Sequence, residues 1–179
     1  MSSGSPPLLL DGPGEAPPGS SEAFRRLLER LYSLARGGSK LGLERMAGLL
    51  ARLGHPEAVV PMVHVAGSNG KGSTSAFLAS ILAASGRKVG LFTSPHLVSL
   101  TERIQIFEDG EGREISQEGL LRAAEIVEAA APEYGEVSFF EVLTALGLVA
   151  FREAGVDVCV IEAGLGARLD STRLVEAEV

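Results

Sequence analysis

One short segment of this chain holds residue types that together can bind phosphate groups. Glycines, a lysine and hydroxyl side chains directly follow an apolar run, in the order Gly67, Ser68, Asn69, Gly70, Lys71, Gly72, Ser73 and Thr74. Glycines let a loop aim its backbone N–H groups at an anion, and a lysine adds a mobile positive charge for the outer phosphates. A Ser or Thr hydroxyl at the end of such a loop can reach a magnesium ion. The segment therefore predicts a loop that binds nucleotide phosphates, with Lys71 as its cation.

The spacing within this loop differs from the commonest pattern, G-x-x-x-x-G-K-[ST]. Lys71 lies four residues after Gly67, and Gly72 separates it from Ser73. A glycine-rich turn that connects a strand to a helix and binds nothing is the alternative interpretation. The combination of glycines, lysine and hydroxyls in one frame favours phosphate binding over that alternative.

Two further oxygen-bearing side chains stand where a magnesium ion could use them. Glu162 follows the apolar run 156–161, and Ser94 follows the run 88–93. Open α/β sheets bind ligands at the carboxyl ends of their strands, and magnesium prefers carboxylate and hydroxyl oxygens together with phosphates and water. We therefore predict Ser94 and Glu162 as metal ligands. For Ser94 the alternative is an ordinary turn serine, and for Glu162 it is a solvated loop glutamate or a partner for Arg168.

Other polar residues have weaker grounds for a chemical role. His64 stands between two valines, which favours a hydrogen-bonded strand histidine. Glu141 completes the pattern Ser138-x-x-Glu141, and a capping box at a helix start accounts for it. No Cys or His stands at metal-ligand spacing from His96, so a zinc site is not expected. Asp170 either shapes a substrate loop or belongs to a plain turn.

Helices and strands alternate along the chain. Apolar residues at helical spacing predict helices at about 21–36, 43–53, 76–84, 116–130 and 138–153. Apolar runs predict strands at about 59–65, 88–93, 103–107 and 156–161, and another strand could begin at 175–179. Strands that alternate with helices favour right-handed crossovers. The predicted fold is α/β, a P-loop-type three-layer sandwich with a mostly parallel sheet of three or four strands, flanked by helices.

Composition limits the class of protein and its partners. With 179 residues, 45% of them hydrophobic and 22% charged, the chain is typical of one globular domain. Residues 1–20 are rich in Pro, Gly and Ser and predict a disordered leader, which leaves 21–179 as the folded domain. A net charge of −7 without a basic cluster argues against a nucleic-acid partner.

The sequence also bears on the compartment. No apolar stretch is long enough to span a bilayer, and the N-terminus lacks a secretory signal pattern, so we expect no membrane association. Cys159 is the only cysteine and lies in an apolar run, as a buried thiol in a reducing compartment would. We therefore expect a cytoplasmic protein.

Several segments together resemble one family, folylpolyglutamate synthase/dihydrofolate synthase, a branch of the Mur ligases. The resemblance covers the amino-terminal part of that family, at about residues 22–179, and the order of its motifs is more specific than the glycine loop alone. The segments are 32–34 with 40–45, 64–74, 93–97, 102–104, 138–144 and 162–172. The chain departs from the family pattern at Ala167, Ser171 and Arg173, where the family has glycine, alanine and asparagine.

The resemblance implies a Mur ligase central domain, here incomplete and without the carboxy-terminal domain. It implies that ATP phosphorylates the carboxylate of dihydropteroate or of a folate's glutamate tail, and that the amino group of L-glutamate then displaces phosphate to form an amide. The cofactors would be ATP and Mg²⁺, with the phosphates on loop 67–74 and the metal on Ser94 and Glu162. Lys71 would be the catalytic residue, because it neutralises charge on the phosphates. Substrate contacts would come from Pro95, His96, Arg103 and Asp170.

The implied partners are small molecules: pteroate or folate, L-glutamate and ATP. We expect a monomer when the protein is full length, and no ligase activity from these 179 residues alone. Two alternatives stay open at this point. One is a non-catalytic nucleotide-binding remnant of a truncated gene, and the other is a different P-loop ATPase or Mur ligase.

Overall fold

The structure, a computed structural model, describes residues 16–35, 43–131, 137–164 and 171–174. Within these ranges five strands form one sheet in the order β1-β5-β2-β3-β4, so the predicted three or four strands are too few. β5 lies between β1 and β2 and runs parallel to both, whereas β3 pairs antiparallel with β2 and with β4. The sheet is therefore mixed, with the predicted parallel arrangement in its β1-β5-β2 half. The strands are β1 (Met62–Val65), β2 (Val89–Phe92), β3 (Ile104–Glu108), β4 (Glu111–Glu114) and β5 (Val158–Glu162).

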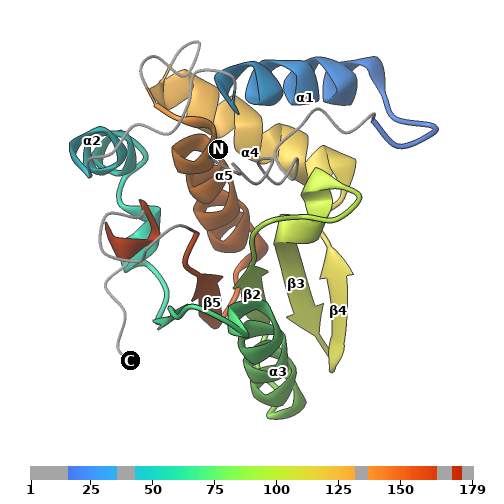
Figure 1. Cartoon of the computed structure of the whole chain (residues 1–179), viewed down its shortest axis with the longest axis vertical. Helices are drawn as coiled ribbons and strands as arrows, with labels where there is room; N and C mark the ends of the chain where they lie inside the picture. The colour runs from blue at the N-terminus through green and yellow to red at the C-terminus, as the bar shows by residue number, and fades with distance from the viewer. Residues whose placement is uncertain (1–15, 36–42, 132–136, 165–170, 175–179) are drawn as a thin grey trace, which may run out of the picture.

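Helices cover both faces of the sheet, which gives the predicted three layers (Figure 1). α3 packs on one face against β5 and β2, and α5 packs on the other, with α1 and α4 beside it. The helices are α1 (Glu22–Ala35), α2 (Glu44–Arg52), α3 (Lys71–Ala84), α4 (Gln117–Ala130) and α5 (Phe139–Ala154). Short 3₁₀ turns are η1 (Pro56–Ala58), η2 (Leu100–Arg103) and η4 (Ser171–Leu174).

The buried side chains of the central strands point alternately to the two faces of the sheet, so the hydrophobic core has two parts. In β5, Val158 and Val160 face α3, while Cys159 and Ile161 join the larger core under α5. Successive side chains of a strand point to opposite faces, so a strand buried on both sides reads as one continuous apolar run. The run 156–161 in the sequence predicted this strand for that reason.

Two element boundaries differ from the predictions, and one strand was not predicted. β1 begins at Met62 rather than at about residue 59, because Val59 is still the C-cap of the 3₁₀ turn η1 (Pro56–Ala58). β4 was not predicted, since its four residues are all exposed and show no apolar alternation. α3 begins at Lys71, so the second half of the glycine-rich segment is the first turn of a helix rather than loop.

Parts of the predicted organisation lie outside the described residues, namely 1–15 of the leader and the strand at 175–179. The described end of the leader contacts the fold, because Ser20 is buried and accepts a hydrogen bond from Gln117 Nε2 at 3.1 Å. The boundary at residue 20 therefore remains a prediction. None of the helices in the described ranges is long and apolar enough to span a membrane.

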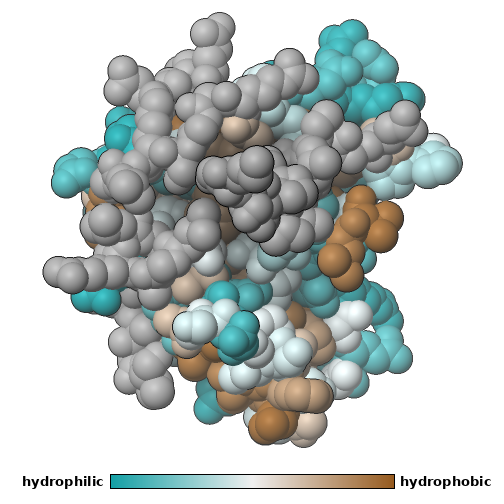
Figure 2. Space-filling model, viewed as in Figure 1, coloured by the Kyte–Doolittle hydropathy of each residue, from teal (hydrophilic) through white to brown (hydrophobic). Residues whose placement is uncertain are grey.

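The outer face of α3 carries two exposed apolar side chains, Phe77 and Ile81, one helical turn apart. Figure 2 shows apolar surface over this part of the molecule. The inner face of the same helix is made of small buried residues, including Ala79 and Ala83, which allow close packing on the sheet.

Burial makes the Cys159 thiol unreactive in the folded protein. Cys159 lies in β5 between the neighbouring strands β1 and β2, and burial raises the pKa of its thiol to about 12. Since the thiolate is the reactive form, we expect no reaction with a thiol reagent such as dithionitrobenzoate at pH 8 until the protein is unfolded. Rapid labelling in the absence of denaturant, at a rate matching a model thiol, would contradict this placement of β5.

Candidate functional site

The glycine-rich segment forms an exposed loop that leads into the start of α3. Residues 66–70 are exposed, and Lys71 and Gly72 are half-buried at the helix start. Gly70, the N-cap, has φ 74°, a left-handed conformation that a side chain would strain. The first turn of α3 contains no acidic residue. Its first N–H groups and the positive end of the helix dipole are therefore available to an anion.

A buried carboxylate faces this helix start. Glu162 is the last residue of β5, is 4% exposed, and accepts a hydrogen bond from the Ser94 N–H to Oε2 at 3.0 Å. A Cβ added to Gly72 would lie 3.6 Å from Oε2 and 3.7 Å from Oε1 of that carboxylate. The absence of a side chain at Gly72 thus leaves room between the helix and Glu162.

The topology of the sheet brings these residues together. Val65, the last residue of β1, is paired with Glu162 in the parallel register, and Phe92 at the end of β2 is paired with Ile161. The loops that follow β1 and β2 therefore leave the sheet beside the end of β5. The prediction that Glu162 lies at the carboxyl end of a buried strand is confirmed.

The donor set at Glu162 suits a magnesium ion better than a metal held by protein alone. Among the described residues, no Lys or Arg forms an ion pair with Glu162, and no group of three His, Cys, Asp or Glu side chains could hold a metal. A buried carboxylate without a positive partner is costly. Magnesium commonly takes one or two protein oxygens and completes its shell with phosphates and water. Glu162 and the half-buried Ser94 fit that role.

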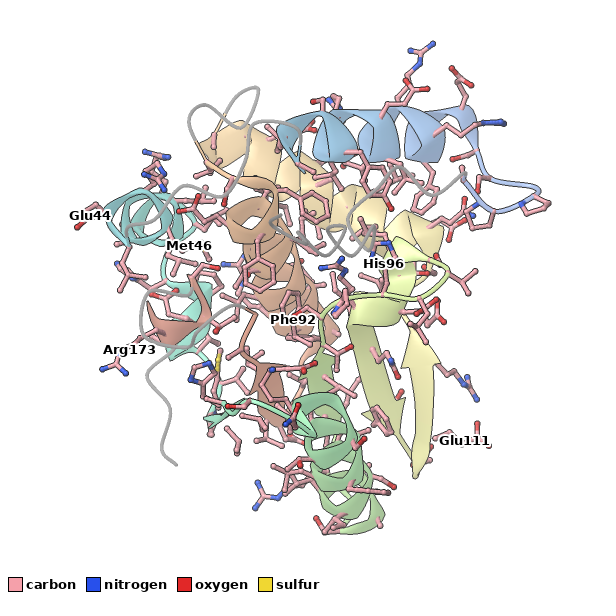
Figure 3. The ribbon with its side chains drawn as sticks, in the orientation of Figure 1. Glu44, Met46, Phe92, His96, Glu111 and Arg173 are labelled. Atoms are coloured by element: carbon pink, nitrogen blue, oxygen red, sulfur yellow. The ribbon has the colours of Figure 1, made fainter. Side chains whose placement is uncertain are left out.

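His96 and Arg103 lie inside the protein. They are 6% and 1% exposed, and Arg103 Nε donates to His96 Nδ1 at 2.6 Å. The Arg103 guanidinium stacks over the Phe139 ring at 5.5 Å, and the Tyr32 hydroxyl lies 3.5 Å from His96 Nε2. Because Nδ1 accepts a hydrogen bond, the proton of a neutral His96 ring is on Nε2. Figure 3 shows His96 within the body of the molecule. Direct substrate contact by either residue remains a prediction.

The remaining predicted residues are less closely grouped. Pro95 is exposed, follows a cis peptide bond to Ser94, and lies on the same loop. Asp170 and the departure from the family pattern at Ala167 lie outside the described residues. Arg173 is exposed and points outward in Figure 3.

Two residues have the structural roles that the sequence favoured. His64 Nε2 lies 2.8 Å from Thr172 Oγ1, so His64 is a hydrogen-bonded strand histidine. The capping box of α5 is present, with the Ser138 N–H donating to Glu141 Oε2 at 2.7 Å.

Ser171, another departure from the family pattern, is buried with its hydroxyl 3.3 Å from Thr144 Oγ1.

Glu102 belongs to a segment that resembles the family, but the sequence analysis gave it no role of its own. Its carboxylate accepts hydrogen bonds from three consecutive backbone N–H groups, those of Leu97, Val98 and Ser99. The spacing Ser99-x-x-Glu102 is that of a capping box, and it could have drawn attention to this residue.

A cavity of about 440 Å³ lies elsewhere, between the β3–β4 hairpin and the helices α4 and α5. Its lining includes Lys88 before β2 and Glu153 near the end of α5. Lys88 and Glu153 lie before the starts of β2 and β5, whereas Glu162 lies at the carboxyl end of β5 and faces Gly72. The cavity is therefore at the opposite end of the parallel strands from Gly72 and Glu162. It is therefore separate from the phosphate and metal candidates.

Comparison with known proteins identifies relatives over most of this chain. No protein-family model matches the chain. A dihydrofolate synthase/folylpolyglutamate synthase of Bacillus subtilis is 46% identical over 160 residues, which are 86% of this chain and 36% of the relative. The chain thus spans about a third of the length of such relatives.

Solved structures of the same kind share the fold. The folylpolyglutamate synthase of Thermotoga maritima has a TM-score of 0.78 at 38% identity, over 87% of this chain and 36% of that one. A bifunctional folylpolyglutamate synthase/dihydrofolate synthase with Mn, AMPPNP and L-glutamate bound has a TM-score of 0.72 at 38% identity, over 83% of this chain and 35% of that one. In sequence and in structure, this chain is therefore homologous to the amino-terminal part of folylpolyglutamate synthase/dihydrofolate synthase.

Proposed function

We propose that this chain supplies the ATP-binding part of an ATP-dependent ligase that joins L-glutamate to the carboxylate of dihydropteroate, of a folate's glutamate tail, or of both. The observation that carries the proposal is the position of the buried Glu162 carboxylate, which faces Gly72 at the start of α3 and binds the Ser94 backbone. Relatives with this fold are named for the same ligation, and one of them holds Mn, AMPPNP and L-glutamate.

The loop 67–74 would hold the phosphates of ATP. Its exposed backbone and the start of α3, whose first turn contains no acidic residue, offer N–H donors, and Lys71 offers a positive charge. Phosphoryl transfer depends mainly on positioning and on neutralising charge. Lys71 is therefore the residue to which we assign the catalytic role, by steadying the charge that develops on the transferred phosphoryl group.

Ser94 and Glu162 would hold the magnesium ion. Glu162 brings negative charge at a buried position, and Ser94 brings a hydroxyl from the adjacent loop. A bound magnesium ion would neutralise phosphate charge during transfer. Pro95, His96, Arg103 and Asp170 would help to shape the neighbouring substrate site, with His96 and Arg103 acting from buried positions.

In this proposal the reaction has two steps. The acceptor carboxylate attacks the γ-phosphorus of ATP, which releases ADP and forms an acyl phosphate. The amino group of L-glutamate then attacks the acyl carbon, phosphate leaves, and an amide forms. We propose small molecules as the only partners, and the net charge of −7 agrees with the absence of a nucleic-acid partner from this proposal. We also propose a monomeric state for the full-length protein and a cytoplasmic location.

The test is glutamate ligation by the complete protein, with dihydropteroate and tetrahydrofolate offered separately. We expect phosphate release that requires ATP, L-glutamate and one of the two acceptors together, and a product heavier by one glutamate residue in mass spectrometry. The acceptor that supports turnover identifies the substrate. Nucleotide binding without ligation of either acceptor would instead support a non-catalytic remnant.

A further inference from the structure

The loop between β2 and β3 is closed where it leaves the sheet. The Thr93 N–H donates to the Arg103 carbonyl at 3.0 Å, so the two ends of the loop are held together. Just inside this closure, the Ser94 N–H donates to Glu162. The loop over 94–102 therefore projects from the point where the candidate metal ligands meet.

One carboxylate organises the far side of this loop. Glu102 accepts the N–H of Leu97 at 2.8 Å through Oε2, and those of Val98 and Ser99 at 2.8 and 2.7 Å through Oε1. Burial raises the pKa of the Glu102 carboxyl, but the three backbone N–H bonds outweigh that effect. The net result is a pKa below its usual value, so Glu102 is ionised at neutral pH.

Side-chain packing does not hold the same turn. Leu97 and Val98 are each 82% exposed, although both are apolar. The backbone of the turn therefore depends on hydrogen bonds to Glu102 rather than on buried apolar contacts. Charge-assisted hydrogen bonds of this kind are roughly twice as strong as neutral ones.

The residue after Glu102 fixes the part of the loop nearest to Ser94. Arg103 is buried and its Nε donates to the side chain of His96. Glu102 thus binds the backbone of the loop at residues 97–99, and Arg103 binds the side chain of the adjacent residue, His96. Movement of the turn at 97–99 would reach Ser94 through only two residues, Pro95 and His96.

We propose that Glu102 is a positioning residue for the metal site: by binding the amides of 97–99, its carboxylate fixes the loop that presents Ser94 beside Glu162. This inference rests on the proposed function, since it takes Ser94 and Glu162 as the metal ligands. In this proposal Glu102 acts through the loop and is not itself a metal ligand or a substrate contact.

The test compares Glu102→Gln with the wild-type complete protein in Mn²⁺ binding, measured by electron paramagnetic resonance with AMPPNP present. Gln is close to Glu in shape, but it loses the charge and turns one acceptor into a donor that faces an N–H group. We expect Mn²⁺ to bind about tenfold more weakly, as when residues that orient metal ligands are changed. Hydrogen exchange at the amides of 97–99 should also become faster.

Two further variants make the result specific. Glu114→Gln is the matched control, because Glu114 contacts the same loop through the Thr101 hydroxyl at 2.6 Å but is not an acceptor for the 97–99 amides. We expect it to bind Mn²⁺ as the wild type does. Glu102→Asp keeps the charge on a shorter side chain, so its affinity should lie between those of the wild type and Glu102→Gln.

The outcomes separate this inference from the proposed function. If Glu102→Gln or Glu102→Asp folds and binds Mn²⁺ as tightly as the wild type while the amides of 97–99 exchange faster, Glu102 is merely structural and the inference is overturned. Equal losses in Glu114→Gln and Glu102→Gln would overturn it as well. A wild-type protein that binds no Mn²⁺ with AMPPNP would refute the proposed function, and this inference with it.

Discussion

Replacing Lys71 with alanine should nearly abolish ATP-dependent, glutamate-dependent phosphate release by the complete protein. Lys71 is the first residue of α3 and the only lysine of the loop 67–74. Removing one preorganised group that stabilises transition-state charge lowers kcat by about 10²–10³-fold, and we expect a loss of at least that size. Steady-state assays of phosphate release at saturating ATP measure it.

A matched lysine provides the control for this variant. Lys88 directly precedes β2, at the opposite end of the parallel strands from the loop 67–74. Its Nζ forms an ion pair with Glu108 at 3.1 Å. Lys88→Ala removes the same charge from the protein without touching the loop, and its turnover should stay within about twofold of wild type because it makes no contact with the proposed site. If Lys71→Ala retained near-normal turnover, the assigned role of Lys71 would be wrong.

The second large effect should follow from replacing Glu162 with glutamine. The amide oxygen of glutamine can still accept the Ser94 N–H, so the local structure should be kept while the negative charge is lost. We expect the magnesium concentration for half-maximal activity to rise by about tenfold or more, since even residues that merely orient metal ligands contribute 10–100-fold to affinity. A magnesium titration of phosphate release measures this shift.

Glu118→Gln on α4 is a suitable control for the Glu162 variant. Glu118 is exposed in the first turn of α4, on the helical layer that covers the other face of the sheet from α3. Its magnesium titration should coincide with that of the wild type. An unchanged titration for Glu162→Gln would leave Glu162 as a structural residue that holds the Ser94 backbone.

Most of the fold could be predicted because local patterns and tertiary packing agree. The continuous apolar run of β5 is buried on both faces, and the Ser138-x-x-Glu141 pattern forms the capping box of α5. Glu162 could be located for the same reason, since the strand before it was unambiguous and ligands bind at the carboxyl ends of such strands.

Other features depend on contacts between distant segments or on turn geometry. β4 has no apolar alternation and follows a tight turn in which Asp109 and Gly110 both have positive φ. The helical start of α3 could not be read from Gly72-Ser73-Thr74, which are poor helix formers. An arginine is rarely buried, and the sequence does not show that Arg103 packs on Phe139 and His96 inside the protein.

The sequence predicts that Gly72 and Glu162 both belong to the site, but the distance between them depends on the order of the strands in the sheet. The two residues belong to different strand–helix units, and the order β1-β5-β2 brings them together. The proposed chemistry depends on this approach, because it puts a carboxylate beside the start of the helix that would bind phosphate.

Equilibrium binding of AMPPNP to the complete protein, with excess Mg²⁺ or with EDTA, tests the central claim most directly. If the loop before α3 holds phosphates and Glu162 helps to hold their metal ion, wild-type protein should bind AMPPNP tightly only with Mg²⁺. Both Lys71→Ala and Glu162→Gln should weaken that binding. Absence of AMPPNP binding, or equal binding in EDTA and in both variants, would contradict the account.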